Sequence, residues 1–146
     1  MPNKLVIHKQ SDMKRIGTSK APKYKTLVAK LDIVFAKWIK KRDTGYINEG
    51  FRCMACNQIK LLDQFNASHY HSRRYMSIRW DEKNVHGCCI RCNKWLAGNI
   101  PEYTKGLIEK YGEGIIQELE IKKMQIRKYS TFELQILIKH YDDKLK

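Results

Sequence analysis

Apolar residues recur at helical spacing in the first third of the chain. Five of them follow one another at steps of four, three, one and three residues: Leu27, Leu31, Val34, Phe35 and Trp38. This spacing places them on one face of an α-helix. The pattern predicts a helix over about residues 25–42 that ends before Thr44-Gly45, with lysines on its other faces.

The last third of the chain shows three further helical segments. Pro101 suits the first turn of a helix that ends at Gly112. A second helix is predicted over about residues 113–128. Ser130 and Glu133 have the spacing of a capping box, which opens a third helix. The apolar face of this last helix consists of Leu134, Leu137, Ile138, Tyr141 and Leu145. We expect it to pack on the middle of the chain or to form a homodimer.

The middle segment, residues 51–100, lacks a long helical stripe and contains all five cysteines. Short strands and loops are predicted before Cys89, followed by a short helix that starts near Cys92 and ends at Gly98. The fold class is therefore α+β. The predicted organisation is a basic flexible arm (1–24), a basic amphipathic helix (25–50), a zinc-stabilised core (51–100) and C-terminal helices (101–146).

Two Cys-x-x-Cys pairs indicate a metal site in this core. Cys53 and Cys56 form the first pair, Cys89 and Cys92 form the second, and 32 residues lie between the pairs. Four thiolates can complete a tetrahedral, structural Zn²⁺ site with no position left for water. A thioredoxin-like pair is disfavoured because two pairs occur and no βαβ pattern surrounds them. Cys88 is the fifth cysteine and an alternative to Cys89.

The charge of the chain is strongly positive and unevenly distributed. The formal net charge is +14. Residues 1–50 carry 12 basic and 4 acidic side chains, residues 51–100 carry 8 and 3, and residues 101–146 carry 9 and 8. A polyanion such as DNA is the expected partner, because lysines and arginines that neutralise phosphates release condensed counterions.

No apolar run approaches the roughly 20 residues that a membrane-spanning helix requires. No secretory signal is visible in the sequence either. We therefore expect a protein of the cytoplasm, of the host cell if the gene is a phage gene, with no membrane partner.

The segment between the cysteine pairs carries the candidate chemistry. It contains His69-Tyr70 and Asn84-Val85-His86-Gly87, and the second pair runs on into Asn93 and then Leu96-Ala97-Gly98-Asn99. These blocks resemble the phage NinG family of recombination endonucleases, also called Rap, over about residues 38–111. More broadly they resemble HNH nucleases. Cys92-Asn93 is similar to phage endonuclease VII, in which an asparagine after the last zinc cysteine binds the catalytic metal.

The resemblance implies a small ββα-metal core, treble-clef-like and zinc-bound, that hydrolyses phosphodiester bonds in branched DNA such as Holliday junctions or D-loops. His69 is the expected general base, because an imidazole with a near-neutral pKa can take a proton from water. Asn93 would bind one catalytic Mg²⁺ or Mn²⁺ ion. Asn84 would brace the hairpin that positions His69.

The sequence departs from the common HNH pattern immediately before the base. Many HNH members have Asp or His there as a metal ligand, whereas this chain has Ser68. His71, Asp63 or water would then complete the ligand set around the catalytic ion. His71 is also an alternative to His69 as the base.

Basic side chains near these residues are the expected DNA contacts. Arginine can hold phosphate oxygens through two hydrogen bonds at once. The candidates are Arg73, Arg74, Arg79, Lys94, Lys37, Lys40 and Lys41. Trp80 and Trp95 are expected in the core.

Two other classes of function fit part of the pattern. A non-catalytic, zinc-stabilised DNA-binding module would explain the charge and the cysteines, but not a histidine and two asparagines in HNH order. An RNA-binding zinc protein would be expected to expose aromatic residues on a sheet. The aromatic residues here fall mostly on predicted helix faces or beside cysteines.

Overall fold

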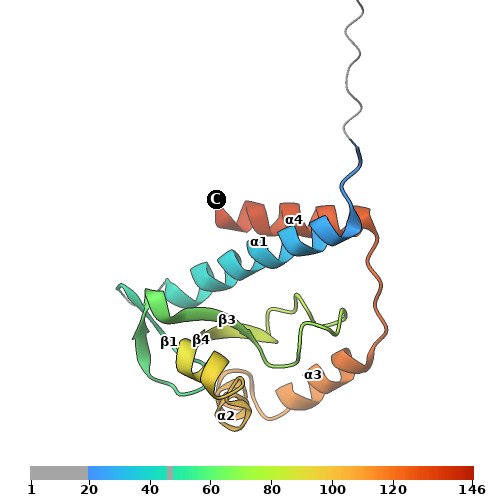
Figure 1. Ribbon diagram of the computed structural model, residues 1–146. Helices are drawn as coiled ribbons and strands as arrows, with labels where there is room; N and C mark the ends of the chain where they lie inside the picture. The colour runs from blue at the N-terminus through green and yellow to red at the C-terminus, as the bar shows by residue number, and fades with distance from the viewer. Residues whose placement is uncertain (1–19, 46–47) are drawn as a thin grey trace, which may run out of the picture.

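The computed structural model describes residues 20–45 and 48–146, and most of the predicted basic arm lies outside these ranges. Within them the chain forms a mixed α+β domain with four α-helices and two small sheets (Figure 1). The elements are α1 (Tyr24–Thr44), β1 (Gly50–Arg52), β2 (Ile59–Leu61), η1 (Leu62–Gln64), β3 (Phe65–His69), β4 (Val85–Cys89), η2 (Arg91–Trp95), α2 (Ile100–Tyr111), α3 (Ile115–Met124) and α4 (Thr131–Leu145).

Both sheets are antiparallel pairs. β1 pairs with β2, and the turn between them contains the first cysteine pair. β3 pairs with β4 in the register His69 opposite Val85 and Phe65 opposite Cys89. The long loop between β3 and β4 returns the chain so that β4 runs directly into the second cysteine pair and η2. This β3–β4–η2 unit carries most of the predicted site residues.

Helix α1 packs against α4 and against β3 and β4 (Figure 1). The cluster that joins them buries Leu31 and Phe35 of α1 together with Leu134 and Tyr141 of α4. The ring of Tyr141 packs edge-on against Phe35, with 5.0 Å between centroids. The apolar face of α4 that prompted the homodimer prediction is thus covered by α1 of the same chain, and it no longer supports that prediction.

A second apolar cluster surrounds the cysteines. Tyr103 and Leu107 of α2, and Ile115 and Leu119 of α3, pack against the cysteine pairs and Phe51. Helix α2 approaches the first pair closely, because a Cβ added at Gly106 would lie 2.2 Å from the carbonyl oxygen of Met54. The two C-terminal helices therefore complete the core around the metal-site cysteines.

Most of the sequence-based elements are confirmed, with shifts at their ends. The predicted helix over 25–42 is α1, and the predicted helix over 113–128 is the shorter α3. Ser130 and Glu133 form the capping box at the start of α4. The short helix after Cys92 begins at Arg91 and has the wider π-helical turn.

One core prediction is wrong. Trp80 is buried at 7% exposure, as expected, but Trp95 is 80% exposed.

In the part of the chain that the structure describes, no helix is both long and apolar enough to cross a membrane.

Candidate functional site

The two cysteine pairs meet at one point. The sulfur atoms of Cys53, Cys56, Cys89 and Cys92 all lie within 4.8 Å of one another, and those of Cys56 and Cys89 are 4.0 Å apart. Four sulfurs around a tetrahedral Zn²⁺ would be separated by about 3.8 Å, given Zn–S bonds of about 2.3 Å. The chemistry and spacing of this donor set fit a metal ion such as zinc.

Hydrogen bonds reach the sulfurs of Cys53 and Cys92, while burial raises the pKa values of Cys56 and Cys92. The backbone N–H of Cys89 donates to Cys53 Sγ over 3.3 Å, and Asn99 Nδ2 donates to Cys92 Sγ over 3.4 Å. A hydrogen bond from the Cys88 thiol, with further bonds from backbone N–H groups, lowers the pKa of Cys53 to about 4. Cys88 itself is buried beside the cluster, and its own pKa is raised by the contact with Cys53. It therefore supports the cluster from outside.

A surface hollow of about 420 Å³ lies between α1 and the β3–β4 hairpin. Its polar lining comes from Asp32, His69, Ser72, Arg73 and Asn93. We call it the His69 hollow. Two predicted site residues, His69 at the end of β3 and Asn93 in η2, thus line one concave surface although 24 positions separate them in the sequence.

The His69 ring has a defined tautomer. Its Nε2 lies 2.9 Å from the carbonyl oxygen of Arg79. Because a carbonyl oxygen only accepts hydrogen bonds, Nε2 carries the proton and Nδ1 of the neutral ring keeps its lone pair. Burial lowers the pKa of His69 below its ordinary value of 6.5, against the opposing effects of the Arg79 carbonyl and Asp32. A free basic nitrogen therefore persists to lower pH than in an exposed histidine.

Asn93 is held by the residue that departs from the HNH pattern. Ser68 Oγ donates to Asn93 Oδ1 over 2.8 Å, and the Ser68 side chain is buried. This hydrogen bond fixes the direction of the amide oxygen and leaves that oxygen a second lone pair. Ser68 thus orients the Asn93 oxygen, whereas an aspartate at position 68 would add a negative charge of its own.

Asn84 ties the ends of the loop between β3 and β4 together. It is fully buried, and its Oδ1 accepts a hydrogen bond from the backbone N–H of His71 over 2.8 Å. Its Nδ2 donates to the carbonyl oxygens of His71, at 3.0 Å, and Ile78, at 3.2 Å. Two of these bonds fix the backbone at His71, two residues after His69, and the third ties Asn84 to the middle of the loop.

A buried chain of hydrogen bonds supports β3 from the opposite side. Tyr103 donates its hydroxyl proton to the carbonyl oxygen of Ser68 over 2.9 Å. The Tyr103 oxygen must then accept from Nδ1 of His86, 3.2 Å away, so Nε2 of His86 accepts from Tyr111, 2.8 Å away. Burial lowers the pKa of His86 to about 2. His86 is therefore a neutral structural residue.

Two of the suggested metal ligands lie elsewhere. His71 Nε2 is 3.2 Å from Glu120 Oε2 on α3, and His71 is not among the residues that line the His69 hollow. Asp63 is exposed in η1, at the opposite end of β3 from His69. Neither residue lines the hollow with Asn93, so the structure disfavours His71 and Asp63 as further ligands of an ion held there.

Asp32 is a site residue that the sequence pattern did not reveal. Its carboxylate accepts two hydrogen bonds from the Arg79 guanidinium, at 2.9 and 2.5 Å, and one from Trp80 Nε1 at 2.9 Å. Arg79 is consequently paired with Asp32 of α1. Its guanidinium is therefore not free to clamp phosphate, which differs from the DNA contact that the sequence predicted for it. The available signal was that Asp32 and Asp43 are the only acidic residues between positions 20 and 45 of an otherwise basic helix.

The remaining basic candidates lie on the surface. Arg73 lines the hollow, and Arg74 donates to the Tyr75 hydroxyl over 2.7 Å. The four lysines are exposed: Lys37, Lys40, Lys41 and Lys94. Lys41 donates to the carbonyl oxygen of Lys144, and the ammonium of Lys40 lies 5.8 Å from the centre of the Phe65 ring.

Comparison with known proteins gives one family. The profile described as Bacteriophage Lambda NinG protein matches residues 4–146. The chain is similar to Protein ninG of Salmonella phage P22, with 31% identity over 116 residues that cover 75% of this chain and 56% of that protein. For the proteins of the same name in Escherichia phage 933W and Escherichia phage lambda, the identities are 29% and 28% over the same length, covering 75% of this chain and 57% and 56% of theirs.

The chain spans slightly more than half the length of these curated relatives. No solved structure matches it.

Proposed function

The chain belongs to the NinG family, and from this premise we propose that it is a metal-dependent DNA endonuclease of the HNH type that cuts branched DNA. One observation carries the proposal: the imidazole of His69 and the amide of Asn93 line the same hollow, beside a four-cysteine cluster that fixes the helix carrying Asn93. Branched DNA as the substrate follows from the resemblance in the residues around this hollow.

His69 would act as the general base. Its Nε2–H is held by the Arg79 carbonyl, so Nδ1 is the nitrogen available to accept a proton from the attacking water. The hydrogen bonds of Asn84 fix the backbone on the C-terminal side of β3, and this keeps the His69 ring at a constant position. General-base catalysis by a positioned side chain contributes about 10²–10⁴-fold to a rate.

Asn93 would hold the catalytic cation. An amide oxygen suits a hard ion such as Mg²⁺ or Mn²⁺, and Asn93 presents its amide at the wall of the hollow. When bound, the ion would neutralise charge on the phosphate and stabilise the leaving 3′ oxygen. Ser68 keeps the Asn93 oxygen aimed in one direction, and Arg73 at the rim would contact a phosphate oxygen.

A nicking assay tests the proposal. Purified zinc-loaded protein would be incubated with a labelled four-way junction, a flap and a linear duplex of matched sequence, with Mg²⁺, Mn²⁺ or no added divalent ion. We expect nicks in the branched substrates that require the added ion and that DNA ligase can reseal, which reports 5′-phosphate and 3′-hydroxyl ends.

Binding to the same substrates without nicking, under either ion, would support the alternative of a non-catalytic zinc-stabilised DNA-binding protein. That alternative draws on the same basic surface and cysteine cluster. It leaves the shared location of His69 and Asn93 without a role, which is why the nuclease is preferred.

A further inference from the structure

An exposed apolar tip follows the last cysteine of the metal cluster. Residues Lys94, Trp95, Leu96 and Ala97 are all exposed, between buried Cys92 and buried Gly98. Trp95 is 80% exposed, whereas Trp80 is 7% exposed and Trp38 is partly buried in the α1–α4 cluster. An indole left in water gives up the stabilisation that burial would supply, and with the neighbouring Leu96 and Ala97 it forms a contiguous apolar surface of the kind that favours binding.

The backbone holds this tip rigidly outward. The N–H of Leu96 donates to the carbonyl oxygen of Arg91, and the N–H of Gly98 donates to that of Cys92, both over 2.9 Å. Ala97, Gly98 and Asn99 follow one another with φ angles of +48°, +90° and +47°. For the two non-glycine residues this left-handed conformation is strained. The turn thus follows directly from the last cysteine of the cluster and leaves Trp95 exposed.

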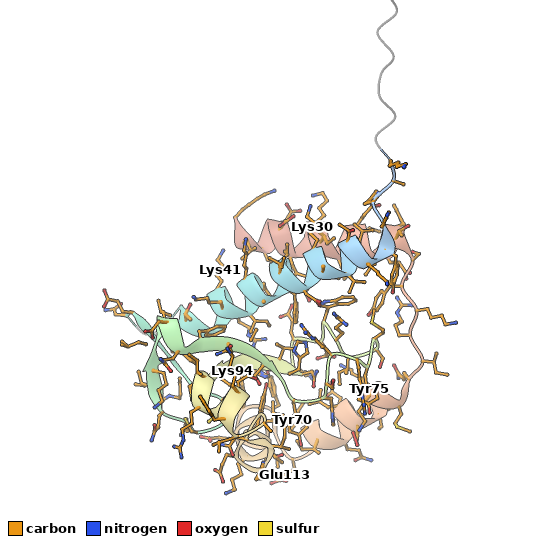
Figure 2. All side chains as sticks on the ribbon, viewed as in Figure 1. Lys30, Lys41, Tyr70, Tyr75, Lys94 and Glu113 are labelled. Carbon is orange, nitrogen blue, oxygen red and sulfur yellow. The ribbon has the colours of Figure 1, made fainter. Side chains whose placement is uncertain are left out.

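The surroundings of the tip are cationic. Arg91 and Lys94 flank it, and neither side chain forms an ion pair within the described residues 20–45 and 48–146. Lys94 is labelled at the start of the tip in Figure 2. Asn93, which lines the hollow, precedes Trp95 by two residues in η2, so the backbone joins the tip to the wall of the hollow while the two side chains point to different sides of the helical turn. A flat aromatic surface beside free cations matches the chemistry of a nucleobase attached to phosphates.

We propose that Trp95 stacks on an unpaired or unstacked base of the DNA that occupies the His69 hollow, and so selects branched over fully paired DNA. The proposal rests on DNA being the substrate, as proposed above. A fully paired duplex offers no free base face to an indole, whereas a branch point does. Trp95 would therefore distinguish branched from linear DNA without distinguishing one base sequence from another.

The test is a binding measurement that does not depend on cleavage. Fluorescence anisotropy would compare a four-way junction with a linear duplex of the same arm sequence, without added Mg²⁺, for the full zinc-loaded chain. The variants are Trp95→Ala, Trp95→Phe as the conservative replacement, and Met124→Ala as a matched control, since Met124 is 77% exposed on α3. A 2-aminopurine base at the branch point reports stacking directly.

We expect Trp95→Ala to weaken junction binding by about 5- to 100-fold, which corresponds to the loss of one stacked base. Duplex binding should be nearly unchanged, Trp95→Phe should retain most of the preference, and Met124→Ala should behave as wild type. The 2-aminopurine signal should be quenched by wild type and not by Trp95→Ala.

Equal binding of the junction by wild type and Trp95→Ala would overturn the inference, even if the wild-type protein nicks DNA. The inference would also be overturned if the wild-type protein sediments as a dimer, Trp95→Ala sediments as a monomer, and the variant loses junction and duplex binding equally. The tip would then join two copies of the chain. A stacking signal in a protein that never nicks would instead support the inference and contradict the proposed hydrolysis.

Discussion

The side chain of Asn84 makes three hydrogen bonds to the loop that begins at His69, and no other residue type of that size can make the same three. Its Oδ1 accepts from the N–H of His71, and its Nδ2 donates to the carbonyl oxygens of His71 and Ile78. A carboxylate of the same shape would accept the first bond and face two carbonyl oxygens without a proton to share.

We therefore predict that Asn84→Asp destabilises the protein by about 2–4 kcal/mol, the range for a buried group that loses its partners. Nicking should fall more than zinc content, because the loop positions His69 while the cysteines lie on other elements. Denaturant unfolding, metal analysis and the junction assay measure the three quantities on one preparation. A variant with wild-type stability would show that the loop holds its shape without this amide.

His86 gives a prediction about pH. Its pKa falls to about 2 in the folded protein because the ring is buried, whereas the unfolded chain titrates near the ordinary value of 6.5. Between these values the unfolded chain binds the additional proton, so stability is fully present above about pH 6.5 and decreases as the pH falls. The slope from one such group approaches about 1.4 kcal/mol per pH unit.

The measurement compares the pH dependence of unfolding free energy for wild type and His86→Gln from pH 7 to pH 5. The variant should be less stable at pH 7, where it loses the hydrogen bonds to Tyr103 and Tyr111, and should have the shallower slope. Effects of acid on the cysteine cluster are common to both proteins and cancel in the difference. Identical slopes would contradict a neutral buried His86.

At the scale of elements, the seating of α2 on the first cysteine pair depends on the missing side chain of Gly106. A methyl group there would meet the Met54 carbonyl oxygen at 2.2 Å, so the helix would have to move away from the metal cluster. We predict that Gly106→Ala costs about 1–3 kcal/mol, as overpacking does in other cores, and speeds the release of zinc to a chromogenic chelator.

The matched control is Gly114→Ala, because a Cβ at Gly114 meets nothing within 4 Å and the residue has an ordinary φ of −74°. Its stability and zinc release should stay close to wild type. Equal behaviour of the two alanine variants would mean that α2 is not seated closely on the cysteine pair.

Element-level features were the most accessible from the sequence. The helical stripes, the capping box of Ser130 and the two cysteine pairs depend on local spacing, and each is found where the pattern placed it. Trp95 and Asp32 were missed because their surroundings come from distant parts of the chain. Trp95 sits in a turn held outward by left-handed residues, and Asp32 meets Arg79 across 47 positions.

The candidate site, too, was predictable from the sequence only in part. A resemblance in short blocks was enough to select His69 and Asn93, which line one hollow. It could not tell that Arg79 is occupied by Asp32, or that His71 turns toward Glu120, because both depend on which helix covers the loop. Long-range packing decides which charged side chains remain free, and local sequence carries little information about it.

At the scale of the whole molecule, the core consists of two apolar clusters. One joins α1 and α4 to the hairpin, and the other surrounds the cysteines and takes in α2 and α3. Cys53, Cys89 and Cys92 are themselves buried members of the second cluster. Binding of a metal ion is therefore coupled to the packing of half the core, and structural zinc sites contribute on the order of 10 kcal/mol to folding.

We predict that removal of zinc by a chelator lowers the helical circular dichroism signal and the melting temperature, and that Zn²⁺ restores both while Mg²⁺ does not. Cys88→Ala should still bind one ion per chain, since Cys88 stands outside the four-sulfur cluster, whereas Cys89→Ala should not. A chelated protein that melts as the untreated protein does would exclude a structural metal.

The central claim is that His69 supplies the base for phosphodiester hydrolysis in a hollow shared with Asn93. Its most direct test is the single-turnover rate of junction nicking by His69→Ala, beside His140→Ala as an exposed histidine on α4, with zinc content equalised. We predict a loss of about 10²-fold or more for His69→Ala and a wild-type rate for His140→Ala. A His69→Ala protein that nicks the junction at the wild-type rate would contradict it.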